Sequence, residues 1–143
     1  MPFDSLTWIE PSKLGDFIKG VRGPKKPLID YAIVDVRDAD FIGGNIPHCI
    51  HIPSSEFAQS VDELVERLKD VPLVVFHCFL SQQRGPKAAR VFLEARVEKL
   101  PDLAGKQEIT ILRGGFSEFQ HFYKGDPELV ENWDASVWDP SIL

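Results

Sequence analysis

Apolar residues form three short continuous runs along this chain. The runs cover residues 31–36, 71–77 and 108–112, and they are rich in β-branched side chains. Such runs, bounded by turn residues, predict strands. The run 71–77 is the most continuous of the three, which is typical of a central parallel strand covered on both faces.

Elsewhere the apolar residues recur every three or four positions, which predicts helices. This spacing covers residues 12–19 and 59–69, a segment that starts at Pro86, and the residues that follow Gly115. Strands that alternate with helices predict an α/β fold with a central, mainly parallel sheet and helices on both faces. Ligands of such sheets bind at the carboxyl ends of the strands.

Length and composition predict a single domain over residues 1–143. The chain has 43% apolar and 27% charged residues, which is ordinary for a packed globular protein. Its net charge of −6 argues against nucleic acid and anionic membranes as partners. We find no apolar run of membrane-spanning length, no secretory signal and only two cysteines, so we expect a cytoplasmic or also nuclear protein. The sequence leaves the oligomeric state open.

The end of the strongest predicted strand carries the candidate chemistry. Cys78 follows this strand, five residues separate it from Arg84, and a helix begins there. Backbone N–H groups of such a loop and the helix N-terminus bind an oxyanion and favour the nucleophilic thiolate. The planar guanidinium of Arg84 suits a phosphate-like group. We therefore predict Cys78 and Arg84 as catalytic residues, and as the anion-binding loop Phe79, Leu80, Ser81, Gln82, Gln83 and Arg84.

Four motifs resemble those of the rhodanese superfamily. They are Asp35-Val36-Arg37, Gly43-Gly44-Asn45-Ile46, His77-Cys78 to Arg84-Gly85-Pro86, and Leu112-Arg113-Gly114-Gly115-Phe116. Together they span about residues 8–123. The five-residue gap is similar to that of Cdc25-type phosphatases and Acr2-type arsenate reductases, and the small fungal rhodanese-like phosphatases are most similar. The resemblance implies a rhodanese-like domain. Residues 124–143 form a C-terminal tail that carries Trp133 and Trp138 among acidic residues, and we expect it to pack on the body through these aromatic side chains.

The favoured function is a cysteine-dependent phosphatase that hydrolyses phosphate monoesters through a phosphocysteine, without a bound cofactor. Its expected substrates are phosphotyrosine or dual-specificity sites of proteins, or small aryl phosphates, so the expected partner is a phosphorylated protein or a small phosphoester or oxyanion. Cdc25-type loops carry glutamates at the positions of Phe79 and Gln83, so the source of a general acid is open. The alternative is an arsenate reductase with glutathione and glutaredoxin as reductant. A non-catalytic phospho-ligand module and a sulfurtransferase are further alternatives.

Three other residues are predicted to support the site. Asp35 and Arg37 lie on alternate strand positions and are expected to form a structural ion pair, while His77 is expected to be a packed residue at the strand end. Cys49 is expected to be a buried, inert thiol. His48, Cys49 and His51 do not suffice for a convergent metal site, so no metal is predicted.

Overall fold

The structure is a computed structural model, and it describes residues 6–138. Five strands form one sheet in the order β1-β5-β4-β2-β3, and every pair of neighbours is parallel. The strands are β1 (Leu6–Ile9), β2 (Ala32–Asp35), β3 (Ile50–His51), β4 (Leu73–His77) and β5 (Glu108–Leu112). The predicted α/β class and parallel sheet are confirmed.

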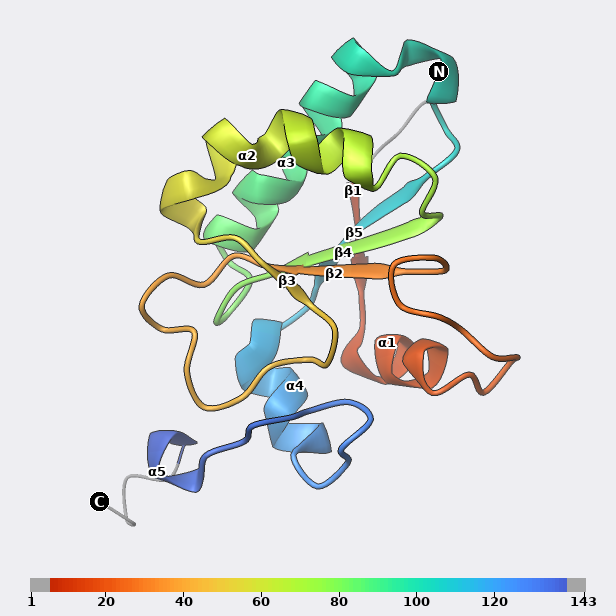
Figure 1. Cartoon of the computed structure of the whole chain (residues 1–143). Coiled ribbons are helices and arrows are strands. Elements are labelled where there is room, and N and C mark those ends of the chain that lie inside the picture. Colours follow the sequence, from red (N-terminus) through yellow and green to blue (C-terminus); the bar gives the residue numbers. More distant parts are fainter. Residues whose placement is uncertain (1–5, 139–143) are drawn as a thin grey trace.

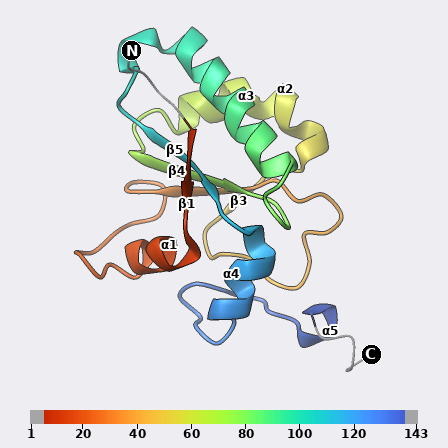
Figure 2. The same cartoon turned by 180° about the vertical axis from the view of Figure 1, so that it is seen from behind.

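Helices cover both faces of the sheet (Figure 1). They are α1 (Pro11–Ile18), α2 (Ser54–Arg67), α3 (Arg84–Lys99), α4 (Gly115–Tyr123) and α5 (Ala135–Trp138), with the short 3-10 turn η1 (Pro101–Leu103) after α3. The view from behind shows α2 and α3 on one face and α1 and α4 on the other (Figure 2). Each face carries its own buried apolar cluster, because the strand side chains alternate between the two faces.

The chain departs from the predicted elements in three places. Helix α2 begins at Ser54, directly after Pro53, which is five residues before the predicted start at 59. Strand β1 was not predicted, since two of its four residues are exposed at the sheet edge. Strand β3 was not predicted either, since it has only two residues.

The segment after α4 returns to the body through two tryptophans. The indole N–H of Trp133 donates to Gln120 Oε1 at 2.8 Å, and that of Trp138 donates to the carbonyl of Gly43 at 2.8 Å. The remainder of the tail segment 124–143, from residue 139 onward, lies outside the described residues. Over residues 6–138, none of the helices has both the length and the apolar character that a membrane crossing requires.

Candidate active site

Cys78 lies at the carboxyl edge of the sheet, directly after the central strand β4. Residues 78–83 form a tight loop, and α3 begins at Arg84. The paired strand β2 ends beside β4, with Asp35 in register with His77. The topology thus brings the loop after β2 and the loop after β4 to one place, as expected for an active site in a parallel sheet.

The Cys78 side chain lies within the loop and accepts backbone hydrogen bonds. The N–H of Ser81 is 3.2 Å from Cys78 Sγ and the N–H of Gly85 is 3.3 Å from it. Ser81 has a φ of 56°, a left-handed conformation that turns its N–H inward. Both N–H groups and the N-terminus of the 16-residue helix α3 thus place positive partial charge beside the sulfur.

The first turn of α4 supports the loop from behind. The N–H of Phe116 donates to the carbonyl of Cys78 at 3.0 Å, and that of Ser117 donates to the carbonyl of Phe79 at 2.9 Å. Gly115 has a φ of 62°, and a Cβ at this position would overlap the carbonyl group of Phe79. This close approach requires glycine, so the Gly-Gly motif holds the nucleophile loop in place.

Arg84 lies at the rim of the loop and is held by two carboxylates. Its guanidinium binds Asp40 with both terminal nitrogens, at 2.9 and 2.7 Å, and Asp38 at 3.1 Å. The hydrogen bonds to Asp40 raise the pKa of Arg84 and lower the pKa of Asp40. The hydroxyl of Ser54, the N–H of Ser55 and Arg84 together lower the pKa of Asp38 to about 2.

Asp35, Arg37 and His77 form a fully buried group beneath the loop. Arg37 donates to the Asp35 carboxylate from Nε and from a terminal nitrogen, the latter at 2.8 Å. Burial opposes the charged form of Asp35, but the His77 ring and the Arg37 guanidinium facing its carboxylate lower its pKa. Burial lowers the pKa of His77, although the Asp35 carboxylate that faces its ring opposes this shift.

A hollow of about 350 Å³ opens above Cys78. Its lining combines the charged side chains of Arg84 and Asp40 with the apolar side chains of Phe79 and Leu80. Gln82 and Gln83 complete the lining with exposed side chains, whereas Ser81 is buried in the loop. The structure therefore brings the predicted nucleophile, loop and arginine together around one open hollow, with His77, Asp35 and Arg37 beneath it.

Cys49 stands apart from this chemistry. Burial raises the pKa of its thiol to about 12, and the side-chain amide of Asn45 contacts its sulfur at 3.7 Å. Neither Cys49 nor Cys78 forms a disulfide. Within the part of the chain that the structure describes, no group of His, Cys, Asp and Glu side chains is arranged to hold a metal ion.

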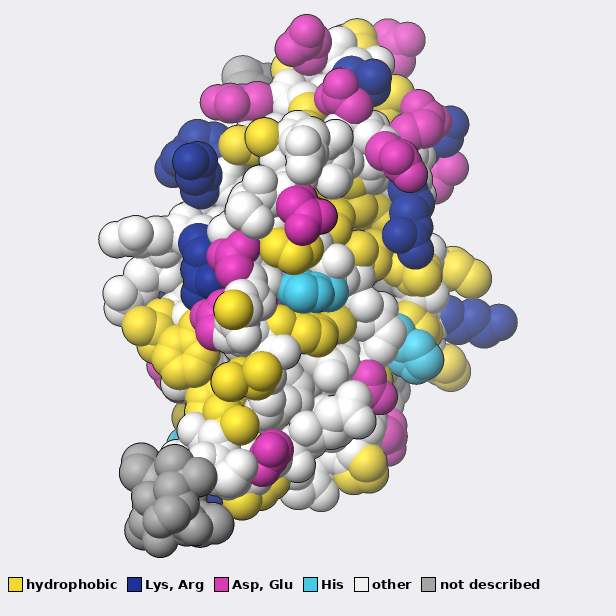
Figure 3. Space-filling model, turned by 60° about the vertical axis from the view of Figure 1, so that its left-hand side comes forward, with side chains coloured by type: hydrophobic (Ala, Val, Ile, Leu, Met, Phe, Trp, Pro, Cys, Tyr) yellow, Lys and Arg dark blue, Asp and Glu magenta, His cyan; other side chains and the backbone are white. Residues whose placement is uncertain are grey.

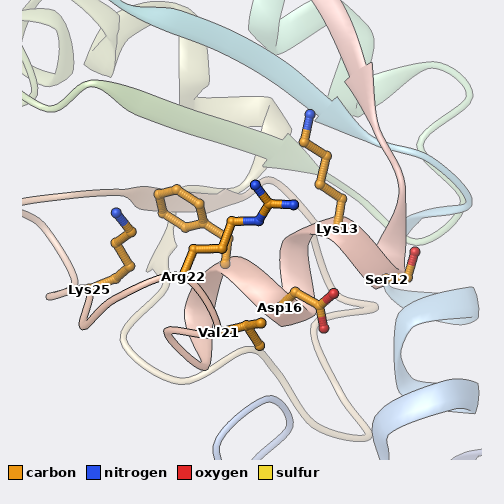
Figure 4. A pocket seen from close by; sticks show the side chains of 7 residues that line it. Ser12, Lys13, Asp16, Val21, Arg22 and Lys25 are labelled. Carbon is orange, nitrogen blue, oxygen red and sulfur yellow. The ribbon is translucent and has the colours of Figure 1, made fainter.

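A second, larger hollow of about 600 Å³ lies along α1 and the loop that follows it. The basic side chains of Lys13, Arg22 and Lys25 surround it, and Lys25 lies over the ring of Phe17 at 5.0 Å (Figure 4). None of the residues that line it belongs to the Cys78 loop. We therefore place the chemistry at the smaller hollow, where the nucleophile is.

Three residues near the site were missed by the sequence prediction. Asp38 and Asp40 contact Arg84 across more than 40 positions of the chain, and Trp138 stacks on Phe79. One signal was available for the two aspartates. They follow the carboxyl end of β2, and polar residues that follow neighbouring parallel strands meet at one edge of the sheet.

Comparison with known proteins shows what this chain is similar to. The chain is 33% identical over 140 residues to the dual specificity phosphatase ibp1 of Schizosaccharomyces pombe, which covers 89% of this chain and 97% of that protein. The structure of yeast Ygr203w, described as a protein tyrosine phosphatase of the rhodanese family, superposes with a TM-score of 0.81 at 29% identity, over 96% of this chain and 99% of that one.

A reductase is similar as well. The As-Sb reductase from Leishmania major superposes with a TM-score of 0.68 at 30% identity, and the match covers 88% of this chain and 85% of that one. The model of the rhodanese-like domain matches residues 22–122, which include the loop after β2, the Cys78 loop and the first turns of α4. This chain therefore belongs to the family of rhodanese-like domains.

Proposed function

We propose that this chain is a cysteine-dependent phosphatase that hydrolyses phosphate monoesters through a phosphocysteine intermediate. One observation carries the proposal. Cys78 Sγ accepts two backbone N–H groups at the N-terminus of α3, inside a loop that Arg84 closes. A buried structural cysteine needs neither these donors nor an open hollow above it. The relatives named as phosphatases support the same reaction class.

The reaction begins with attack of the Cys78 thiolate on phosphorus. As the sulfur–phosphorus bond forms, the bond from phosphorus to the ester oxygen breaks, and that oxygen leaves with the electron pair and takes a proton from solvent. Water then attacks phosphorus, the sulfur–phosphorus bond breaks, and inorganic phosphate and the thiolate are released. Preorganised N–H donors of the loop stabilise the charge that develops on the equatorial oxygens.

Arg84 must exchange its partners during this cycle. In the structure it binds Asp38 and Asp40, with about one third of its side chain exposed. A phosphate group offers the same pair of acceptor oxygens as a carboxylate and carries more charge, so it competes for the guanidinium. Substrate binding thus replaces a carboxylate partner with the transferred phosphoryl group.

Arsenate reduction is the second candidate function. The absence of carboxylates at Phe79 and Gln83 favours it, because reduction of a thiol-bound arsenate has no alkoxide leaving group to protonate. In this reaction Cys78 Sγ bonds to arsenic(V) with loss of water, and a glutathione thiolate then attacks Sγ. The sulfur–arsenic bond breaks with its electron pair going to arsenic, so arsenic(III) leaves and Cys78 and glutathione form a mixed disulfide. Glutaredoxin would restore the two thiols. The phosphatase needs no bound cofactor, and both reactions suit a reducing compartment such as the cytoplasm or nucleus.

A pre-steady-state time course with an activated aryl phosphate tests the proposal. We expect a burst of phenol release followed by steady turnover for the wild type, none for Cys78→Ser, and an unchanged course for Cys49→Ser. A burst of one equivalent that then stalls would contradict hydrolysis and favour arsenate with glutathione as the reaction. The absence of a burst would contradict the formation of a phosphocysteine and favour a non-catalytic module that binds a phospho-ligand.

A further inference from the structure

The hollow above Cys78 has an apolar part to its lining. Phe79 and Leu80 line it, and Leu80 is 45% exposed. Phe79 stacks on Trp138 with the ring planes 2° apart and the centroids 5.5 Å apart. We call Phe79, Leu80, Val137 and Trp138 the apolar rim. On the face shown in Figure 3, hydrophobic side chains gather directly beside a group of basic and acidic side chains.

Trp138 is fixed rather than loosely placed behind Phe79. Its indole N–H donates to the carbonyl of Gly43, and its ring also meets Phe116 with centroids 5.9 Å apart. A Cβ at Gly43 would come within 2.6 Å of the indole nitrogen, so the glycine makes room for this ring. Phe79 is therefore held between the nucleophile loop and an aromatic support from the C-terminal part of the chain.

Asp40 is the one carboxyl group among the described residues that line the hollow, and Asp38 shares its partner Arg84. The pKa values of Asp38 and Asp40 lie below their usual range because of their hydrogen bonds to Ser54 and Arg84, so both carboxylates are ionised at neutral pH. A leaving phenolate, with a pKa of about 10, needs protonation much less than an alkoxide does. The ionised carboxylates thus favour an aryl ester, and the apolar rim offers a surface for its ring.

We propose that Phe79, supported by Trp138, makes this site selective for aryl phosphates, with phosphotyrosine as the protein form, over alkyl phosphates such as phosphoserine. The inference rests on the proposed function and names its substrate class. Phe79 is the specificity-determining residue, because it lines the hollow next to Cys78, and Trp138 positions it. Ring packing of this kind favours the aryl ligand by roughly two- to tenfold.

Phosphonates test the rim without any leaving group. We would measure phenylphosphonate and methylphosphonate as competitive inhibitors of aryl phosphate hydrolysis. For the wild type we expect phenylphosphonate to bind roughly two- to tenfold more tightly. Phe79→Ala and Trp138→Ala should remove this preference and leave methylphosphonate unchanged. Phe79→Leu keeps an apolar side chain in the loop but removes the ring, so it separates loss of the aromatic contact from loss of loop folding. Phe122→Ala removes an exposed aromatic side chain on α4 and serves as the matched control.

Turnover of matched phosphotyrosine and phosphoserine peptides supplies the second measurement. The wild type should prefer the phosphotyrosine peptide, and the preference should fall in both rim variants but not in Phe122→Ala. Equal inhibition by the two phosphonates, or a preference that the rim variants do not change, would overturn the inference. Sustained turnover in the same experiment would still support the phosphatase function. Loss of all turnover in the wild type would instead remove the proposed function.

Discussion

Two groups of arginine and aspartate lie at the same edge of the sheet in different surroundings. The side chains of Asp35 and Arg37 have no solvent exposure, whereas about one third of the side-chain surface of Arg84, Asp38 and Asp40 is exposed. Arg37 also donates to the carbonyls of Ile42 and Gly44, and its guanidinium lies 4.4 Å from the Phe116 ring centroid.

The difference separates a structural pair from an exchangeable one. The charges of Arg37 and Asp35 are both buried, and leaving either of them unpaired there is costly. The hydrogen-bond partners of Arg84 within the described residues are carboxylates at the mouth of the hollow, which water or a ligand can replace. The buried pair of Asp35 and Arg37 thus fixes the loop after β2. The exposed group leaves Arg84 with carboxylate partners that a ligand anion can replace.

Asp35→Asn should give the largest effect, on stability. It leaves the Arg37 charge buried without its counter-charge, which costs about 3–5 kcal/mol of unfolding free energy. Urea denaturation followed by circular dichroism measures it. The control is Glu66→Gln, whose partner Lys69 is exposed, and it should cost less than about 0.5 kcal/mol. A loss below about 1 kcal/mol for Asp35→Asn would remove the distinction between the two groups.

Asp40→Asn should affect ligand binding more than stability. It removes the carboxylate that binds both terminal nitrogens of Arg84, so the guanidinium becomes available to an anion and local repulsion falls. We expect the inhibition constant of inorganic phosphate to fall by about three- to tenfold, which corresponds to the free energy of an exposed ion pair or slightly more. Steady-state competition assays measure it.

Asp126→Asn is the control for this measurement, because it breaks an exposed pair with Lys19 that does not involve Arg84. It should leave phosphate inhibition unchanged. An inhibition constant that rises in Asp40→Asn would show that the carboxylate orients Arg84 toward the ligand rather than competing with it.

The sequence predicted the parts of the site that are local along the chain. The strand, cysteine, loop and arginine occur within twelve residues, from Leu73 to Arg84, and the alternation of Asp35 and Arg37 along the predicted strand indicated their pairing. The contacts of Arg84 with Asp38 and Asp40 depend instead on how the loop after β2 crosses to α3. Trp138 reaches Phe79 from a segment 59 positions away. No local pattern encodes either contact.

Prediction of the strands and helices from the sequence has the same limit. Strand β4 and helix α3 were predicted because burial on both faces and helical spacing leave strong patterns. Strand β1 was missed because it is paired on one side only and exposes Thr7 and Trp8. The first turn of α2 was missed because the apolar spacing begins only at Phe57, although Ser54 already lies in the helix.

The smallest expected effect concerns Asp38, one of the two carboxylates that bind Arg84, and the loss of its charge at low pH. The folded-state pKa of Asp38, about 2, lies below its ordinary value of 3.8, so its stabilising contribution is present above pH 3.8 and is lost as the pH falls toward 2. Since Asp38 is one third exposed, we expect Asp38→Asn to cost less than about 1 kcal/mol at pH 7. Urea denaturation at pH 7, 4 and 2.5 should show this difference from wild type shrinking in the last step. A difference that persists at pH 2.5 would mean that Asp38 stabilises the loop through its neutral hydrogen bonds to Ser54 and Ser55 rather than through its charge.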